Sequence, residues 1–405
     1  MNINDQLKSY CIFLLLFLVI ISPSLVSTPL NNFFAYIIIA LVLLLSLLYA
    51  NRIKLNSTCF IFGLAFVITP VFSLFNILHH QEWTLNSVLF GYFRFSILGV
   101  CFWSFYSFSS YFDSKSSFGI VKFLVLINLC VLIIGALFPA FNDALFYLYY
   151  NQQSYDEFYA YMVGRPGGLL GNPNTLAMTM VFLLLFFLQS EKISNRFFYI
   201  SIIIFIVILT KSRTGLFGLF ICLSFYFILM RRFSSFFYFT SIFCVVVILG
   251  LISGYFDVDS LIERYISGVN LSGREELWLN VVKNGFFLDN YLSGIFLIPS
   301  DFDAVDNEYL NILVKFGLLG SVLFLLAHLM LLFSVVKQYL SNKKNEKSVL
   351  SIICILLFLI FSIAGSPLTS IKLSFVYLIV LAFFINKSSE VTNESVNYGS
   401  GSFKV

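Results

Sequence analysis

The chain has 405 residues, of which 60% are hydrophobic, 19% are aromatic and only 11% are charged. A soluble fold has to cover its surface with polar side chains, so this composition excludes a soluble globular protein. The formal net charge of +4 is uninformative until the charges are placed along the chain, and we expect no nucleic-acid partner.

Apolar runs of about 20 residues, the length that crosses a bilayer as a helix, recur along the chain. We expect an all-α integral membrane protein in which residues 1–386 form one polytopic membrane domain, followed by a disordered cytoplasmic tail at 387–405. The first apolar run is expected to be a retained helix rather than a cleaved signal peptide, because further spans follow at once. The twelve predicted transmembrane helices are 10–27, 33–50, 58–78, 87–108, 120–139, 174–189, 197–210, 214–230, 236–253, 309–336, 349–365 and 370–386.

The basic residues orient this topology. If the N-terminus is cytoplasmic, every inside segment holds at least one lysine or arginine, while short outside loops such as 28–32 and 79–86 hold none. The positive-inside rule therefore predicts that both termini are cytoplasmic and that the number of spans is even. The 15 inside residues, of 24 basic residues in all, are Lys8, Arg52, Lys54, Lys115, Lys122, Lys192, Arg196, Arg231, Arg232, Lys337, Lys343, Lys344, Lys347, Lys387 and Lys404.

Two predicted outside segments, 140–173 and 254–308, are too long to be turns. Loops above roughly 12–15 residues are usually functional or disordered. Both segments are rich in Tyr, Phe and Leu, which is unlike a disordered composition. We therefore expect the functional site on the extracytoplasmic side.

Two stretches near the middle of the chain place arginines at this outer face. In "GRPGGLLGNPNTLAM" at 164–178, Asn174 or Thr175 is expected to cap the following span, and Asn172 and Arg165 precede it. Glycine and proline alone would indicate only a tight loop, but Arg165 favours a binding site. The stretch "TKSRTGLFG" at 210–218 holds two cations. Snorkelling to lipid headgroups explains Lys211 well, whereas Arg213 could equally face inward as a functional residue.

Two further stretches lie in and after the second long loop. "LSGREELW" at 271–278 combines an S-x-x-E capping box with Arg274, so that the cap would hold this arginine in the first turn of a short amphipathic helix. In "DNEYLNILVKFGLLG" at 306–320, Asp306 fits the N-cap position of the next span. An acidic cap is a sufficient structural explanation, but capping and catalysis are compatible.

Arg94 lies about two turns inside its span, where a cation needs a partner or a water-filled cavity. Guanidinium groups recognise phosphate by paired hydrogen bonds, so these outer arginines suggest a lipid-linked phosphate or pyrophosphate substrate. No HExxH motif occurs, the three histidines do not form a ligand cluster, and the seven cysteines lie in or at the edge of apolar spans. We therefore expect no metal ion and no other cofactor.

The order of these motifs, R-P-x-G-L-x-G-N-P-N, then S-R-T-G, S-G-R-x-x-x-W and a polar pair followed by Y-L, resembles the bacterial O-antigen polymerase and ligase superfamily. The motifs cover about residues 160–320, and the topology covers the whole chain. The resemblance implies a GT-C-like glycosyltransferase with a large periplasmic loop between late helices. It also implies a place in the bacterial inner membrane, an active site that faces the periplasm, and inversion at the anomeric carbon. The ligase branch is expected to have a histidine in the late motif, where this chain has Asp306-Asn307-Glu308-Tyr309-Leu310, so the polymerase branch is favoured.

An O-antigen polymerase joins undecaprenyl-pyrophosphate-linked repeat units for lipopolysaccharide biosynthesis, and it requires no metal in this interpretation. The alternatives are a ligase that transfers polymer to lipid A core and a flippase or transporter for lipid-linked oligosaccharides. The expected partners are the lipid-linked repeat units, membrane lipids, a chain-length regulator and other O-antigen assembly proteins. The expected catalytic residues are Asp306, Glu308, Arg274 and Arg213, and the expected substrate-binding residues are Arg165, Arg213, Arg274, Arg94, Asn172, Asn174, Asn307 and Tyr309.

Overall fold

A computed structural model describes residues 56–72, 85–109, 114–138, 165–189, 195–252, 307–343, 345–365 and 370–399, with isolated positions elsewhere. All regular secondary structure in this part of the chain is helical. Its ten α-helices and one 3₁₀ helix are α3 (Ser57–Ile68), α5 (Leu85–Ser109), α6 (Ser114–Leu137), η3 (Gly168–Leu170), α9 (Pro173–Leu188), α10 (Arg196–Leu209), α11 (Arg213–Leu229), α12 (Phe233–Ile252), α16 (Glu308–Ser341), α17 (Glu346–Ala364) and α18 (Ile371–Gly399).

The ten α-helices coincide with the third to the twelfth predicted span, one helix for each span. Predicted spans 10–27 and 33–50 lie outside the described residues, apart from five isolated helical positions. Three helical stretches, Phe118–Leu137, Glu308–Ser341 and Glu346–Ile363, are long and apolar enough to cross a membrane, and six other apolar helices are shorter. The all-α fold is therefore confirmed for the described residues, and its apolar helices are consistent with a helical membrane protein, whereas twelve transmembrane helices are not confirmed.

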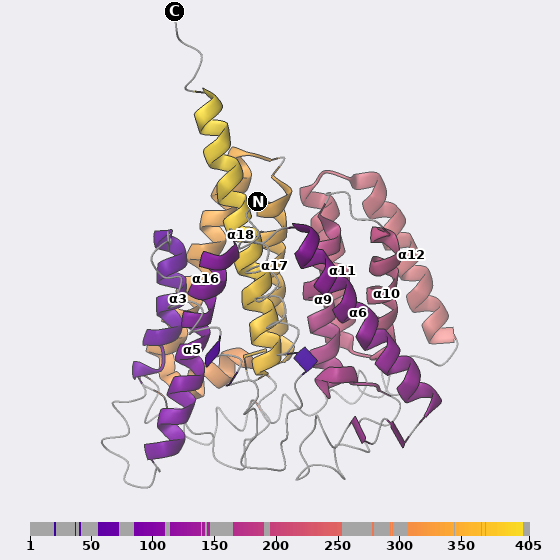
Figure 1. The fold of residues 1–405 in the computed structure, drawn as a ribbon, viewed down its shortest axis with the longest axis horizontal. Helices are drawn as coiled ribbons and strands as arrows, with labels where there is room; N and C mark the ends of the chain where they lie inside the picture. The colour runs from indigo at the N-terminus through magenta and orange to yellow at the C-terminus, as the bar shows by residue number, and fades with distance from the viewer. Residues whose placement is uncertain are drawn as a thin grey trace, which may run out of the picture.

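The helices alternate in direction because their connections are short. Three residues join α10 to α11, three join α11 to α12, and six join α17 to α18. Figure 1 shows the resulting bundle, with α18 rising toward the C-terminus. In consequence, α9 and α11 begin at the same end of the bundle. The same is true of α16 and α18.

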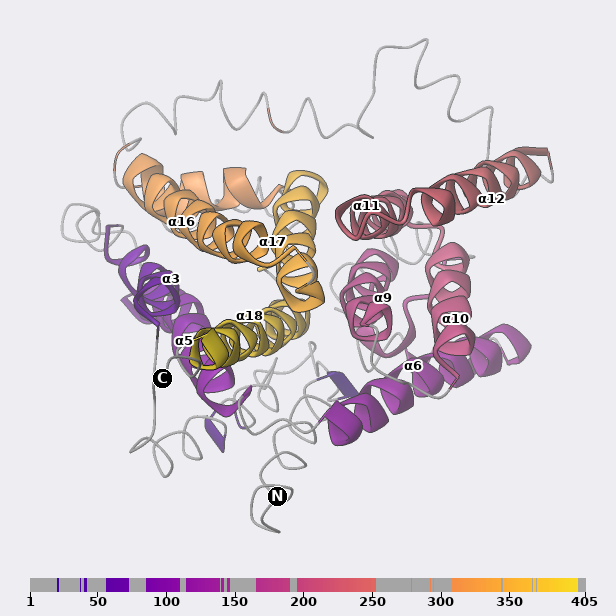
Figure 2. The same cartoon turned by 90° about the horizontal axis from the view of Figure 1, so that it is seen from above.

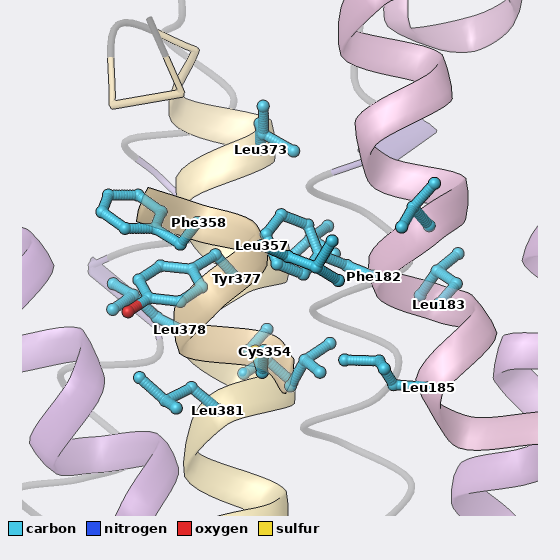
Figure 3. Close-up of a cluster of buried hydrophobic side chains, with 14 of the residues drawn as sticks. Phe182, Leu183, Leu185, Cys354, Leu357, Phe358, Leu373, Tyr377, Leu378 and Leu381 are labelled. Carbon is cyan, nitrogen blue, oxygen red and sulfur yellow. The ribbon is translucent and has the colours of Figure 1, made fainter. Parts of the chain in front are cut away.

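Helix α9 lies at the centre of the bundle. Every residue from Leu176 to Leu188 is buried, which suits a helix that has no charged residue on any face. It contacts α10, α11, α17 and α18. Figure 2 shows the arrangement of these helices from above, with α17 and α18 facing α9 and α11. The apolar layer between them includes Phe182 of α9 and Tyr377 of α18, whose ring centroids lie 5.7 Å apart (Figure 3).

Helix α16 is broken at Gly317, whose backbone has φ 68° and ψ −174°. The sequence predicts one long span at 309–336, but the structure has a short helical arm at 308–316 followed by a longer helix at 318–341. The break accommodates part of the long loop, because the Leu319 N–H donates to the Leu292 carbonyl at 3.2 Å. Glycine is required there because a Cβ on Gly317 would lie 2.4 Å from the same carbonyl oxygen.

Helix α18 is longer than its predicted span. It continues to Gly399, so residues 387–399 are helical where the sequence predicts a disordered tail. The segment has no proline, and its first glycine is Gly399 itself. Nothing before this glycine therefore interrupts the propagation of the helix.

Candidate functional site

The loop that carries Arg165 is a compact turn of glycines before α9. Gly168 and Gly171 have φ values of 55° and 73°, a conformation that glycine adopts without steric cost. A Cβ on Gly167 would lie 2.2 Å from the Gly171 carbonyl oxygen, so the two ends of the turn are in close contact. The Leu170 and Gly171 amides donate back to Gly167 and Gly168, both at 3.3 Å. The loop therefore gives Arg165 a defined position.

Asn172 caps α9. Its side-chain oxygen accepts the backbone amides of Asn174 at 2.8 Å and Thr175 at 3.3 Å. The prediction that Asn174 or Thr175 is the cap is wrong by two or three residues. Proline is preferred at the first helical position because its fixed φ suits the helix and it lacks the amide hydrogen, so Pro173 makes Asn172 the cap.

Because Asn172 caps the helix, the side chain of Asn174 can join two loops. Its Oδ1 accepts from Arg165 Nη2 at 3.1 Å and from Ser212 Oγ at 2.8 Å. Arg165 Nε also donates to the Thr210 carbonyl at 3.4 Å. Arg165, Asn174, Thr210 and Ser212 form what we call the arginine cluster. The acceptors in these bonds are neutral groups, and the bonds orient the guanidinium.

Arg213 begins α11 directly after this cluster. Ser212 is the N-cap of α11, and its Oγ accepts the Gly215 amide at 3.1 Å. Arg213 is exposed in the first turn. A cation in the first turn is disfavoured by the helix dipole, whereas an anion is favoured there. Lys211, also exposed, has a left-handed backbone with φ 50°. Two cations therefore flank Ser212 beside amides that favour an anion.

The described part of the late motif, Asn307–Leu310, packs against the connection between α17 and α18. Asn307 caps α16, and its side chain accepts the Leu310 amide at 3.1 Å. The prediction that Asp306 occupies this N-cap position is therefore wrong by one residue. Both residue types are good caps, so the sequence favours neither position.

Glu308 is 3% exposed. Its Oε2 accepts the Leu368 amide at 2.8 Å, and its own amide donates to the Gly365 carbonyl at 3.1 Å. The Tyr309 hydroxyl donates to the Leu359 carbonyl at 2.8 Å. Glu308 and Tyr309 thus fix the start of α16 to α17 and to the residues that follow it.

The arginine cluster and the late motif lie at one end of the bundle. A Cβ on Gly365 would lie 2.9 Å from Met178 Cε. Met178 is one helical turn after Asn174 on the same face of α9. The late motif is therefore adjacent to the arginine cluster. We call this end, where α9, α11, α16 and α18 begin, the site end.

The structure brings together five residues predicted from the sequence, Arg165, Asn172, Asn174, Asn307 and Glu308, with Arg213 and Tyr309 beside them. Arg274 and Asp306 lie outside the described residues. Arg94 lies in α5, and only its backbone is described. Among the described residues, no three His, Cys, Asp or Glu side chains gather as metal ligands would.

Sequence reasoning missed Lys372, Ser212 and Thr210. Lys372 is 8% exposed at the start of α18, and its Nζ donates to the Ile20 and Leu169 carbonyls at 3.2 and 3.4 Å. A lysine within a predicted apolar span was the signal that could have identified it. Ser212 and Thr210 gave no such signal, because hydroxyl residues commonly stand at helix ends.

Comparison with protein-family models gives no match, and comparison with curated proteins also gives none.

Proposed function

We propose that this protein is an O-antigen polymerase, a glycosyltransferase that joins undecaprenyl-pyrophosphate-linked repeat units. The observation that carries the proposal is the arginine cluster, in which Asn174 joins the Arg165 loop to the loop that presents Arg213. Both stretches are motifs on which the resemblance rests, although they are about 45 residues apart in the sequence. Their meeting at one end supports a single anion-binding site.

The electrostatics of the site end suit a pyrophosphate. Arg165 is oriented by neutral acceptors, and Arg213 stands at a helix start where backbone amides also favour an anion. Guanidinium groups bind phosphate oxygens in pairs, and pyrophosphate leaves readily once its charge is held. We assign Arg213 and Arg274 to the stabilisation of the leaving pyrophosphate, with Arg165 and Arg94 in substrate binding.

The acceptor sugar needs a group that orients or deprotonates its hydroxyl. Asp306 is the first candidate and Glu308 the second. The burial of Glu308 and its bond to the Leu368 amide support this order, because that carboxylate already holds the connection after α17. In this mechanism the acceptor hydroxyl attacks the anomeric carbon, its proton passes to the carboxylate, and the bond to pyrophosphate breaks. The polymer grows by one repeat unit. Asn172, Asn174, Asn307 and Tyr309 shape the site around the sugars.

This mechanism places the site end at the periplasmic face of the bacterial inner membrane, with both termini in the cytoplasm. Lipid-linked repeat units would approach through the surrounding bilayer. A chain-length regulator and other O-antigen assembly proteins are the proposed protein partners, and no metal or other cofactor is required.

The surface polysaccharide of a deletion strain tests the proposal. A polymerase deletion leaves a single repeat unit on lipid A core. A ligase deletion leaves none there, while polymer accumulates on the carrier lipid, and a flippase deletion removes the surface repeats altogether. A full-length ladder on the gel would contradict the proposed function.

The roles of the arginines are tested by Arg213→Ala and Arg274→Ala in the complemented strain. Each is expected to abolish or shorten the ladder while the protein remains in the membrane, since removing one such donor costs about 10²–10³-fold in rate. Arg231→Ala is the matched control, because Arg231 is an exposed arginine just past the opposite end of α11. Wild-type ladders from well-expressed Arg213→Ala and Arg274→Ala proteins would exclude the pyrophosphate role.

A further inference from the structure

Lys372 is a buried cation at the site end. It is the second residue of α18 and the only charged residue in the apolar stretch Ile371–Ile385. Its side chain is 8% exposed, and its Nζ donates to the carbonyl oxygens of Ile20 and Leu169. These contacts join three parts of the chain that are far apart in the sequence.

A structural role alone would not require a lysine there. Burial of an ammonium group carries a large desolvation cost. The first turn of a helix is also unfavourable for a positive charge. A neutral donor could hold a carbonyl oxygen at lower cost. A cation inside a membrane protein therefore points to a function that uses its charge.

Leu169 belongs to η3, in the middle of the loop that begins with Arg165. Asn128 of α6 lies against the same turn, since its Oδ1 is 3.2 Å from the position of a Cβ on Gly168. Asn128 is completely buried, and this oxygen has no hydrogen-bond partner. Lys372 and Asn128 therefore both lie against the turn that sets the position of Arg165.

Lys372 also follows directly on the connection that Glu308 holds. Glu308 accepts the Leu368 amide, and Ser374 Oγ donates to the Pro367 carbonyl at 3.0 Å. A continuous set of contacts thus runs from the late motif through the start of α18 to Leu169 and the Arg165 loop.

We infer that Lys372 is a positioning residue of the anion site, which holds the Arg165 loop in register with the late motif. This inference rests on the proposed function. Its substrate class is a lipid pyrophosphate, and Lys372 acts on it through Arg165 and Asn174.

Lys372→Met tests the inference, because methionine keeps an unbranched apolar side chain and removes the charge and the donors. Binding is measured as the shift in Tm of the full-length protein in lipid nanodiscs on addition of farnesyl pyrophosphate. We expect this probe to stabilise the wild-type protein and to bind Lys372→Met roughly 10-fold to 100-fold more weakly, the scale of hydrogen bonds made by a charged donor. Lys372→Arg is expected to restore most of the binding.

A double-mutant cycle with Arg165→Ala separates positioning from general destabilisation. If Lys372 acts through the loop, Lys372→Met has little further effect on probe binding once Arg165 is absent. Effects of independent sites would instead add. Lys347→Met, at the start of α17 and the opposite end of the bundle, is the matched control and is expected to bind the probe like the wild type.

The results for Lys372→Met, the wild-type protein and the deletion strain together decide between three outcomes. Weak binding by Lys372→Met, rescue by arginine and non-additivity with Arg165→Ala support the inference. Wild-type binding and a wild-type ladder for Lys372→Met overturn it while leaving the proposed function intact. No binding by the wild-type protein, with a full ladder in the deletion strain, overturns both. If Lys372→Met does not accumulate in the membrane, Lys372→Gln, which is also neutral, replaces it with the same expected weakening.

Discussion

Asn174→Ala tests the arrangement of the arginine cluster, because this one side chain accepts from both Arg165 and Ser212. The bond from the charged donor is worth roughly 1.5–3 kcal/mol and the neutral bond about 0.5–1.5 kcal/mol, so together they restrain the two loops by roughly 2–4.5 kcal/mol. The cap of α9 is unaffected, because Asn172 provides it. The substitution therefore removes the link between the loops without removing the start of the helix.

We expect Asn174→Ala to lower the rate of repeat-unit addition by at least about 30-fold, which corresponds to roughly 2 kcal/mol in the activation barrier. The expected loss of stability is smaller, because Arg165 and Asn174 are only partly buried and water can replace some of the lost bonds. The assay is ladder formation by purified protein in vesicles, with Tm measured on the same samples.

Two further variants sharpen this test. Asn174→Asp keeps the acceptors but places a carboxylate against Arg165, so it is expected to keep the loops in place and still lose activity through charge neutralisation. Asn345→Ala is the matched control, since Asn345 caps α17 at the opposite end; it is expected to cost about 1 kcal/mol of stability with an unchanged rate. A wild-type rate for Asn174→Ala would refute the argument that the cluster orients Arg165 for catalysis.

Three other predictions concern the frame of the site. Gly215→Leu is expected to lower the Tm by overpacking at a cost of about 1–3 kcal/mol, because a Cβ there would lie 2.3 Å from Ala177 Cβ; an unchanged Tm would contradict this. Gly317→Ala is expected to cost roughly 1–3 kcal/mol through its positive φ, and wild-type thermal stability would count against it. Glu308→Gln is expected to keep the ladder and Glu308→Ala to lose it, because glutamine can still accept the Leu368 amide. Loss with both variants would instead favour direct catalysis.

The positions of the helices could be predicted from the sequence, because runs of about 20 apolar residues have one common solution in a membrane. The exact caps could not. Asn172, Asn174, Asp306 and Asn307 are all good capping residues, and the choice among them depends on the rotation of each helix against its neighbours.

The break in α16 and the partners of Lys372 could not be predicted either, although the position of this lysine in an apolar span could have marked it as a candidate. Gly317 looks like any glycine in an apolar helix, and only its contact with Leu292 shows why the helix breaks there. Lys372 bonds to Leu169 and Ile20, which are 203 and 352 residues away in the chain. Contacts at such separations depend on the packed fold, and a single sequence does not reveal them.

Reconstitution of the purified protein in vesicles, with undecaprenyl-pyrophosphate-linked repeat units as the only substrate, tests the central claim most directly. We expect chains of increasing length to appear on the carrier lipid without any other protein, and Arg213→Ala to suppress them. Repeat units that remain single with well-folded wild-type protein, or that only cross the bilayer, would contradict it.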